Sequence, residues 1–180
     1  MKKYIICYSI AGVLLLISCA LMPHHRTRKG THQLPSKQIL TGWLTQQQLF
    51  GQSQEYQLEK DRYLPDTESR EKLKTLIADV QLIIFLGTWC PDSRREVPRF
   101  LKIMELIKNP HITFKLFGLD RSKRDPDGLA EKYKIEFVPT FIVLHNEVEI
   151  GRIVETPIVS IEQDLVEIVT PLMNRNGLDD

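Results

Sequence analysis

An unbroken apolar stretch at residues 82–86 (Leu-Ile-Ile-Phe-Leu) most constrains how this chain can fold. Five consecutive apolar residues have the length of a strand, and a strand without polar alternation is typically buried on both faces of its sheet. The stretch leads through a short turn into Trp89, Cys90 and Pro91, and proline suits the first turn of a helix. The sequence therefore predicts a central strand that runs into a helix, with a thiol at the junction.

Alternating strand and helix patterns follow this junction. The expected elements are, in order, a helix that starts at Pro91 and stops at Asn109-Pro110, a strand at 112–119, a short helix at 125–133, a hairpin of strands at 140–144 and 148–154, and a helix that follows Ser160. Strands that alternate with helices form a sheet with helices packed against it. The predicted fold class is therefore α/β, a three-layer sandwich whose mixed central sheet carries helices on both faces.

The pattern before the junction is less regular. A helix is predicted to start at Asp66, because apolar residues then recur at i, i+3, i+4 and i+7, namely Leu73, Leu76, Ile77 and Val80. Residues 39–63 are interpreted as an N-terminal extension packed on the main fold. In this extension Thr45 and Gln48 match a capping box, and a strand is expected to begin near Tyr56.

Several features of this order together resemble thioredoxin. Trp89 and Cys90 stand at the strand-to-helix junction, Pro98 lies eight residues after the cysteine, and residues 138–140 (Val-Pro-Thr) open the hairpin. The resemblance extends over about residues 73–172 and includes the order of the elements. We therefore identify the chain as similar to the thioredoxin superfamily.

The resemblance implies that Cys90 is a nucleophile and that Pro139 forms a cis peptide bond against it. Backbone N–H groups and the dipole at a helix N-terminus stabilise a thiolate, and only the thiolate attacks a disulfide. Trp89, Pro91, Val138 and Pro139 are the expected substrate-binding residues. Trp89 would offer a flat apolar surface, and the backbone of Val138 would pair with an extended substrate segment.

The chain departs from the thioredoxin pattern at two positions. The second thiol, normally three residues after the nucleophile, is replaced by Ser93, so that the motif is Cys-Pro-Asp-Ser. Ser93 cannot attack a mixed disulfide, but its hydroxyl can donate a hydrogen bond to the Cys90 thiolate, and we predict both as catalytic residues. The acid that the family often places six residues before the nucleophile is Ile84 here. Three charged residues at the helix start are expected to be exposed and to have small effects: Asp92, Arg94 and Arg95.

The first residues carry an export-signal pattern. Lys2 and Lys3 precede an apolar run at 4–21. Residues 16–19 (Leu-Ile-Ser-Cys) resemble the bacterial lipobox, which implies cleavage before Cys19 and attachment of lipid to it. An uncleaved membrane anchor is the alternative, because about 18 apolar residues can just span a bilayer.

The predicted organisation has three parts. Residues 1–18 are a signal peptide, residues 19–38 a polar and basic flexible linker, and residues 39–180 a thioredoxin-like domain with its core at about 66–174. The lipid would hold the protein on a membrane of the bacterial cell envelope, with the domain facing the periplasm.

Cysteine usage leaves one thiol for chemistry. Of the three cysteines, Cys7 would leave with the signal peptide and Cys19 would carry lipid, so that only Cys90 remains. A single thiol in an oxidising compartment is either incidental or reactive. The net charge of +1 gives no indication of a nucleic-acid partner. His24 and His25 lack partners at ligand spacing, and we predict no metal and no cofactor.

Two functions of different classes are compatible with these patterns. The first is a monothiol thiol-disulfide oxidoreductase or isomerase, in which Cys90 forms a mixed disulfide that the substrate's second cysteine or a small thiol resolves. The second is a non-catalytic peptide-binding or chaperone-like module, in which the groove beside Trp89 and Pro139 holds peptides and Cys90 is vestigial. The predicted partners are protein or small-molecule thiols and disulfides.

Overall fold

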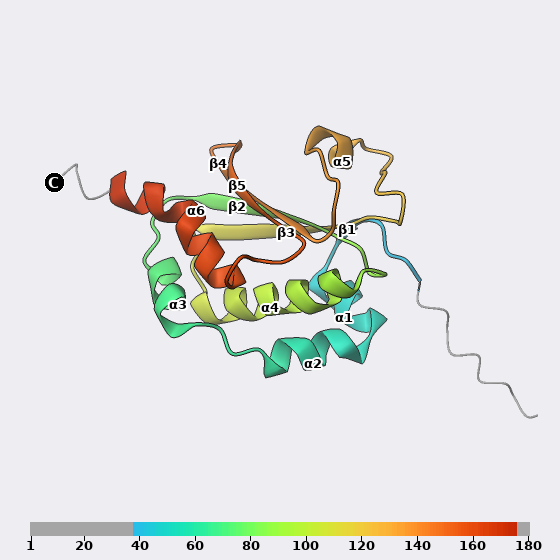
Figure 1. Cartoon of the computed structure of the whole chain (residues 1–180), viewed down its shortest axis with the longest axis horizontal. Coiled ribbons are helices and arrows are strands. Elements are labelled where there is room, and N and C mark those ends of the chain that lie inside the picture. Colours follow the sequence, from blue (N-terminus) through green and yellow to red (C-terminus); the bar gives the residue numbers. More distant parts are fainter. Residues whose placement is uncertain (1–37, 176–180) are drawn as a thin grey trace, which may run out of the picture. The chain divides into compact units, whose positions relative to one another are not determined.

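The computed structural model describes residues 38–175, and a mixed five-stranded sheet forms the centre of this part (Figure 1). The strand order is β1-β3-β2-β4-β5. β2 and β3 are parallel, and the other neighbouring strands are antiparallel. The strands are β1 Gly42–Leu44, β2 Val80–Leu86, β3 Ile112–Gly118, β4 Thr140–His145 and β5 Val148–Val154. The apolar stretch at 82–86 is thus the larger part of the central strand, as predicted.

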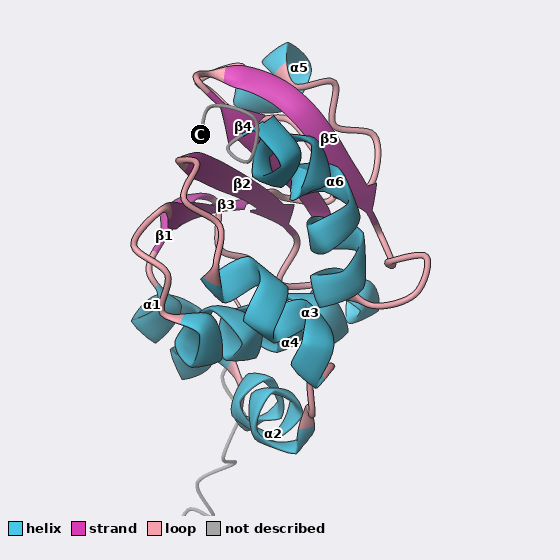
Figure 2. Cartoon of the chain, turned by 90° about the vertical axis from the view of Figure 1, so that its left-hand side faces the viewer, coloured by secondary structure: helices cyan, strands magenta, loops and turns pink. Residues whose placement is uncertain are grey.

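Helices cover both faces of the sheet, but unequally. The helices are α1 Gln46–Gln52, α2 Gln54–Arg62, α3 Thr67–Lys74, α4 Pro91–Ile107, α5 Leu129–Lys132 and α6 Ile161–Arg175. Figures 1 and 2 show α5 above the sheet and the other helices below it. The predicted α/β sandwich is therefore confirmed, with its second face covered by one short helix and the loops around it.

Alternate side chains of β2 enter two cores, as a strand covered on both faces requires. The even-numbered residues of 82–86 pack in the larger core, together with Phe100 of α4. Ile83 and Phe85 pack in the smaller core, where the Phe85 ring lies 5.7 Å from that of Tyr133 between centroids. Because both cores meet at β2, the strand that leads to Cys90 is held from both sides.

The predicted helix after Asp66 is shorter than its apolar spacing suggested. α3 ends at Lys74, Ile77 is 63% exposed, and Val80 begins β2. The buried amide of Asn109 explains this end, because its Nδ2 donates to the carbonyls of Leu73 and Leu76, both at 2.8 Å. A distant side chain thus satisfies carbonyls that the helix end leaves free.

Residues 39–63 fold as β1, α1 and α2, and the strand predicted near Tyr56 was wrong. Thr45 forms the predicted capping box of α1, with Thr45 N–H donating to Gln48 Oε1 at 2.8 Å. α2 starts at Gln54, and its buried face consists of Tyr56 and Glu59. The helical spacing was obscured because one of these two buried residues is a carboxylate.

Asp66 caps α3 through its side chain, and this capping should be lost in acid. Its Oδ2 accepts the Ser69 N–H at 2.7 Å, and hydrogen bonding with Ser69 lowers the pKa of the Asp66 carboxyl. A carboxyl with a lowered folded pKa stabilises fully above its unfolded value of about 3.9, and the effect disappears as the pH falls through the folded value. We expect Asp66→Ala to destabilise the protein at neutral pH, in urea unfolding, and this difference from the parent chain to shrink below about pH 4. A difference that grew on acidification would contradict this assignment.

Candidate active site

Cys90 is the N-cap residue of α4, at the point where β2 leads into this helix. Its N–H donates to Gly87 O at 2.9 Å, and its carbonyl accepts the Arg94 N–H at 3.1 Å. Pro91 occupies the first helical position, where its missing N–H costs no hydrogen bond. The first turn of a helix leaves N–H groups without helical acceptors, and these provide partial positive charge beside the sulfur.

The thiol meets the proline turn that lies 48 residues further along the chain. Cys90 Sγ donates to Val138 O at 3.1 Å, and the Val138-Pro139 peptide bond is cis. Cys90 is 6% exposed and Val138 is buried as well. The thiol therefore donates a hydrogen bond to the Val138 carbonyl, which was expected to be free to bind substrate. A thiolate cannot donate, so ionisation of Cys90 releases Val138 O at the moment it creates the nucleophile.

Trp89 forms one wall of the site. Its Nε1 donates to Leu119 O at 3.0 Å, which fixes the half-buried indole. A Cβ at Gly87 would lie 2.7 Å from Trp89 Cε2, so glycine at this position lets the ring lie where it does. The Arg121 guanidinium carbon lies 4.9 Å from the ring centroid. With the exposed Pro91 nearby, Trp89 gives the site an apolar rim.

Ser93 is fully buried in the first turn of α4. Its Oγ accepts the Gly87 N–H at 3.1 Å, so it ties the turn before Cys90 to the helix after it. Within residues 38–175, Ser93 Oγ forms no hydrogen bond with Cys90 Sγ. The geometry thus gives Ser93 a structural task at the site, and its predicted catalytic role stays a prediction.

The charged residues at the start of α4 are paired and only partly exposed. Asp92 Oδ1 lies 2.8 Å from Arg95 Nη2, and Arg94 Nη1 lies 3.3 Å from Glu55 Oε2 on α2. Asp92, Arg94 and Arg95 are therefore less exposed than expected, since each side chain lies against its partner. Paired opposite charges largely cancel at a distance, so these four residues exert little net field on the thiol.

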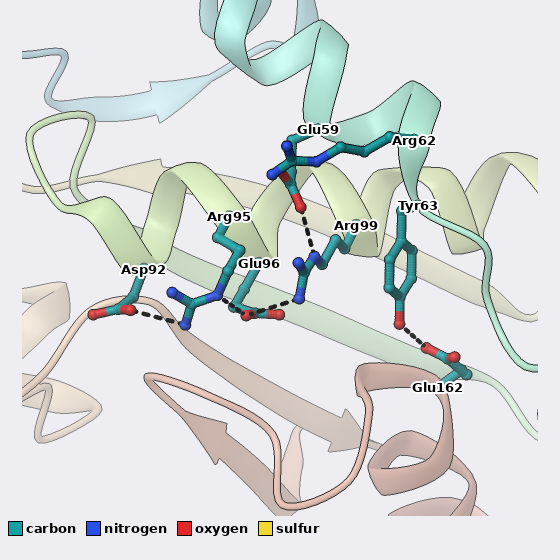
Figure 3. Close-up of polar contacts among 8 residues, drawn as sticks. All are labelled: Glu59, Arg62, Tyr63, Asp92, Arg95, Glu96, Arg99 and Glu162. Atoms are coloured by element: carbon teal, nitrogen blue, oxygen red, sulfur yellow. Dashed lines mark hydrogen bonds and ion pairs between the residues drawn. The ribbon is translucent and has the colours of Figure 1, made fainter.

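A buried ion network anchors α2 on α4, and the sequence analysis missed it (Figure 3). Arg99 Nε donates to Glu59 Oε1 at 2.8 Å, and its Nη1 donates to Glu96 Oε1 at 3.4 Å. Glu59 and Glu96 are both buried. Arg62 pairs with Glu59, and Arg95 Nε lies 2.5 Å from Glu96 Oε1. Spacings of three residues could have suggested the pairs within each helix, but nothing local indicated that the helices share Arg99.

A second link in Figure 3 joins the end of α2 to the start of α6. Tyr63 Oη donates to Glu162 Oε2 at 2.9 Å, and Glu162 Oε1 accepts the Asp66 N–H at 2.7 Å. Burial, together with this hydrogen bond, raises the pKa of the Tyr63 hydroxyl. Through these contacts and the Arg99 network, the N-terminal extension is attached to both α4 and α6.

Tyr56 brings an unpartnered hydroxyl close to the site. The residue is fully buried, and its Oη has no hydrogen-bond partner among the described residues. Burial raises the pKa of Tyr56, while the charge of Arg94 opposes the shift and Glu55 and Cys90 add to it. A buried hydroxyl without a partner costs about 1–3 kcal/mol.

The two tyrosines allow a matched comparison. We expect Tyr56→Phe to leave the free energy of unfolding unchanged or to raise it by up to about 1 kcal/mol, because it removes an unpaired group. We expect Tyr63→Phe to lower it by about 1–2 kcal/mol, because Glu162 loses a donor. Urea unfolding of both variants measures the difference. Equal destabilisation by the two changes would show that the Tyr56 hydroxyl has a partner.

The predicted leader lies outside the described residues. This applies to the signal peptide at 1–18, the lipidation site Cys19 and all but the last residue of the linker at 19–38. Within residues 38–175, no helix has the length and apolarity needed to cross a bilayer.

Comparison with known proteins identifies the family. The sequence profile of the family described as Thioredoxin matches residues 46–167, which is more than half of the chain. The chain therefore belongs to the thioredoxin family. Family membership supports a role in thiol-disulfide chemistry, with thiol or disulfide partners.

Two thioredoxins are among the sequences similar to this chain. An H-type thioredoxin from Fagopyrum esculentum is 33% identical over 90 residues, covering 48% of this chain and 72% of the relative. A putative thioredoxin-5 from Dictyostelium discoideum is 32% identical over 88 residues, covering 49% and 80%. Among solved structures, a protein of unknown function from Pseudomonas aeruginosa has a TM-score of 0.46 at 22% identity, covering 73% of this chain and 84% of that one. Reduced thioredoxin 2 from the same organism has a TM-score of 0.40 at 22% identity, covering 61% and 96%.

Proposed function

We propose that this protein is a membrane-tethered monothiol thiol-disulfide oxidoreductase or isomerase that works through Cys90. The observation that carries the proposal is the position of Cys90 Sγ, at the N-terminus of α4 and 3.1 Å from Val138 O. This position gives the sulfur partial positive charge on one side and a backbone carbonyl on the other. Partial positive charge at a helix N-terminus stabilises a thiolate. The Val138 carbonyl can accept a hydrogen bond from the backbone of a bound segment once the thiol proton has left.

The first step is attack on a disulfide. The Cys90 thiolate forms a bond with one substrate sulfur, the substrate S–S bond breaks, and its electron pair leaves with the second sulfur as a thiolate. Trp89 and the Val138-Pro139 turn border the sulfur, so the substrate segment is expected to lie across them. The product of this step is a mixed disulfide between Cys90 and the substrate.

The second step needs a thiol from outside the site. The substrate's own thiolate or a small thiol attacks the mixed disulfide, and the electron pair returns to Cys90 as its thiolate. With the substrate's own thiol, the net result is isomerisation and no electrons are consumed. With a small thiol, the net result is transfer of the thiol adduct to that small thiol. Ser93 cannot supply this attack, so mixed disulfides should be long-lived.

Trapping of the mixed disulfide tests the chemistry. The purified full chain and its Cys90→Ala variant are incubated with a peptide that carries one disulfide, then acid-quenched and weighed by mass spectrometry. We expect one more stable peptide adduct on the parent chain than on the variant, which shares Cys7 and Cys19 with it. A parent chain that reacts no faster than free cysteine at neutral pH would overturn the proposal.

A peptide-binding module is the second candidate. Two observations together favour it. Cys90 is only 6% exposed, and the apolar rim beside it includes Phe137, which is 47% exposed. Binding of reduced, cysteine-free peptides by fluorescence anisotropy distinguishes the two. Equal affinity of the parent chain and Cys90→Ala, together with no adduct in the trapping experiment, would establish this candidate instead.

The membrane tether belongs to the same proposal. We infer from the lipobox-like residues 16–19 that cleavage precedes Cys19 and that lipid holds the domain in the bacterial cell envelope, facing the periplasm. The mass of the mature N-terminus measures this directly. Retention of residues 1–18, or a Cys19→Ser variant that fractionates and weighs like the parent chain, would contradict it.

A further inference from the structure

The loop between β3 and α5, residues 119–128, brings cations to two aromatic residues, Trp89 and Phe137, which precede Cys90 and Val138 in the sequence. Arg121 lies over the Trp89 ring, with 4.9 Å between its guanidinium carbon and the ring centroid. Lys123 Nζ lies 5.7 Å from the centroid of Phe137. Trp89 precedes Cys90, and Phe137 precedes the residue whose carbonyl accepts the thiol proton. The two cations therefore border the site from one loop.

Neither cation is part of an ion pair within the described residues. The charges on the opposite side of the thiol are in pairs, as the Asp92-Arg95 contact at 2.8 Å shows. The cations over Trp89 and Phe137 are therefore not held in an ion pair within the described residues.

The acids of the same loop are occupied by its own backbone. Asp120 Oδ1 accepts the N–H of Ser122 at 2.8 Å and its hydroxyl at 2.6 Å, and these bonds lower the pKa of the Asp120 carboxyl. Asp125 accepts from the N–H groups of Leu129 and Ala130 at the start of α5, at 3.0 and 2.8 Å. The Asp120 and Asp125 carboxylates thus accept hydrogen bonds from the loop itself and from the start of α5. The Arg121 and Lys123 side chains can instead bind a carboxylate of a substrate.

The two cations differ in their surroundings: Arg121 lies over Trp89, the residue before the thiol, and Lys123 lies over Phe137. Lys123 also lines a hollow of about 600 Å³, together with Arg124 and Lys134 and with the acids Asp125, Glu131 and Glu136. Charges of both signs balance there. Arg121 does not line this hollow, so the cation over Trp89 stands outside this balanced set of charges.

We propose that Arg121 and Lys123 select acidic polypeptide segments, so that disulfides flanked by Asp or Glu are the preferred substrates of Cys90. The inference rests on the proposed function and names its substrate class. A carboxylate beside the substrate cysteine would meet a guanidinium or ammonium group already placed on an aromatic face. Such rim charges mainly raise the association rate, and salt weakens them.

Three matched peptides provide the test. Each carries one cysteine as a mixed disulfide with 5-thio-2-nitrobenzoate, flanked by Asp, Ser or Lys, and release of the coloured thiolate reports attack by Cys90. Each rate is divided by the rate of the same peptide with 2-mercaptoethanol, which removes differences in intrinsic reactivity. At low salt we expect the acidic peptide to react roughly ten-fold faster than the basic one, and the ratio to approach one at high salt.

Variants assign the selectivity to the loop. The double variant Arg121→Gln/Lys123→Gln should lose the preference, while the Ser-flanked peptide still reacts faster with it than with Cys90→Ala. The control Lys72→Gln/Lys115→Gln removes the same charge elsewhere, including a lysine that lies 5.7 Å from the Trp43 ring, and should keep the preference. Equal rates for acidic and basic peptides on the parent chain would overturn the inference alone. Failure of even the Ser-flanked peptide to react faster than with Cys90→Ala would overturn the proposed function.

Discussion

Replacing Arg99 with methionine is expected to lower the free energy of unfolding by about 2–4 kcal/mol. The change would leave Glu59 and Glu96 buried without the guanidinium that they share. Removing one partner of a buried ion pair costs about 3–5 kcal/mol in fully buried cases, and Arg99 is 28% exposed, so water reduces the penalty. Methionine has a comparable stem, so the packing of the arginine alkyl chain is largely kept. Urea unfolding of the full chain measures the loss.

Arg62 provides the matched control for this change. It pairs with the same Glu59, but its side chain is 71% exposed. Arg62→Met should cost at most about 1 kcal/mol, as exposed ion pairs do. Neutralising both acids should rescue the Arg99 variant, so that Glu59→Gln/Glu96→Gln/Arg99→Met unfolds at a higher urea concentration than Arg99→Met. A similar cost for the two arginines would show that the network adds nothing beyond surface pairing.

The centre of this fold could be predicted because its signals are local. The apolar residues 82–86, followed by Cys90 and Pro91, determine a buried strand and a helix start within about ten residues. The hairpin strand at 148–154 has the predicted bounds for the same reason. The meeting of Cys90 with Val138 is not local, and only the resemblance to thioredoxin indicated it.

The missed features depend on contacts between distant segments. Asn109 ends α3 from another part of the chain, so no spacing around Ile77 could show that the helix stops early. Glu59 faces the interior because Arg99 binds it there, and a hydrophobic pattern cannot contain that information. Arg121 likewise gains its place over Trp89 only when the loop after β3 folds back. Each of these residues is polar, and each depends on its partner for its position.

Ser93→Cys is expected to turn the monothiol site into a dithiol reductase. Residues at i and i+3 lie side by side in a helical turn, within the Cα separation that a disulfide requires. The new thiol would attack the mixed disulfide on Cys90, form an intramolecular disulfide with the Cys90 sulfur and release the substrate as a thiol. Because this attack is intramolecular, the lifetime of the mixed disulfide should fall by ~100-fold or more. Insulin reduction, with dithiothreitol supplying the electrons, should then become measurable.

Ser93→Ala separates this gain from the structural task of the serine. The buried Ser93 Oγ accepts the Gly87 N–H, and alanine leaves that donor unpaired at a cost of about 1–3 kcal/mol. Alanine should therefore lower stability without shortening the lifetime of the mixed disulfide. Ser93→Cys should also be less stable than the parent chain, because sulfur is a weaker acceptor for the Gly87 N–H. It should nonetheless shorten the lifetime of the mixed disulfide. A cysteine variant whose mixed disulfides last as long as those of the alanine variant would mean that the turn after β2 holds position 93 out of reach of the Cys90 sulfur.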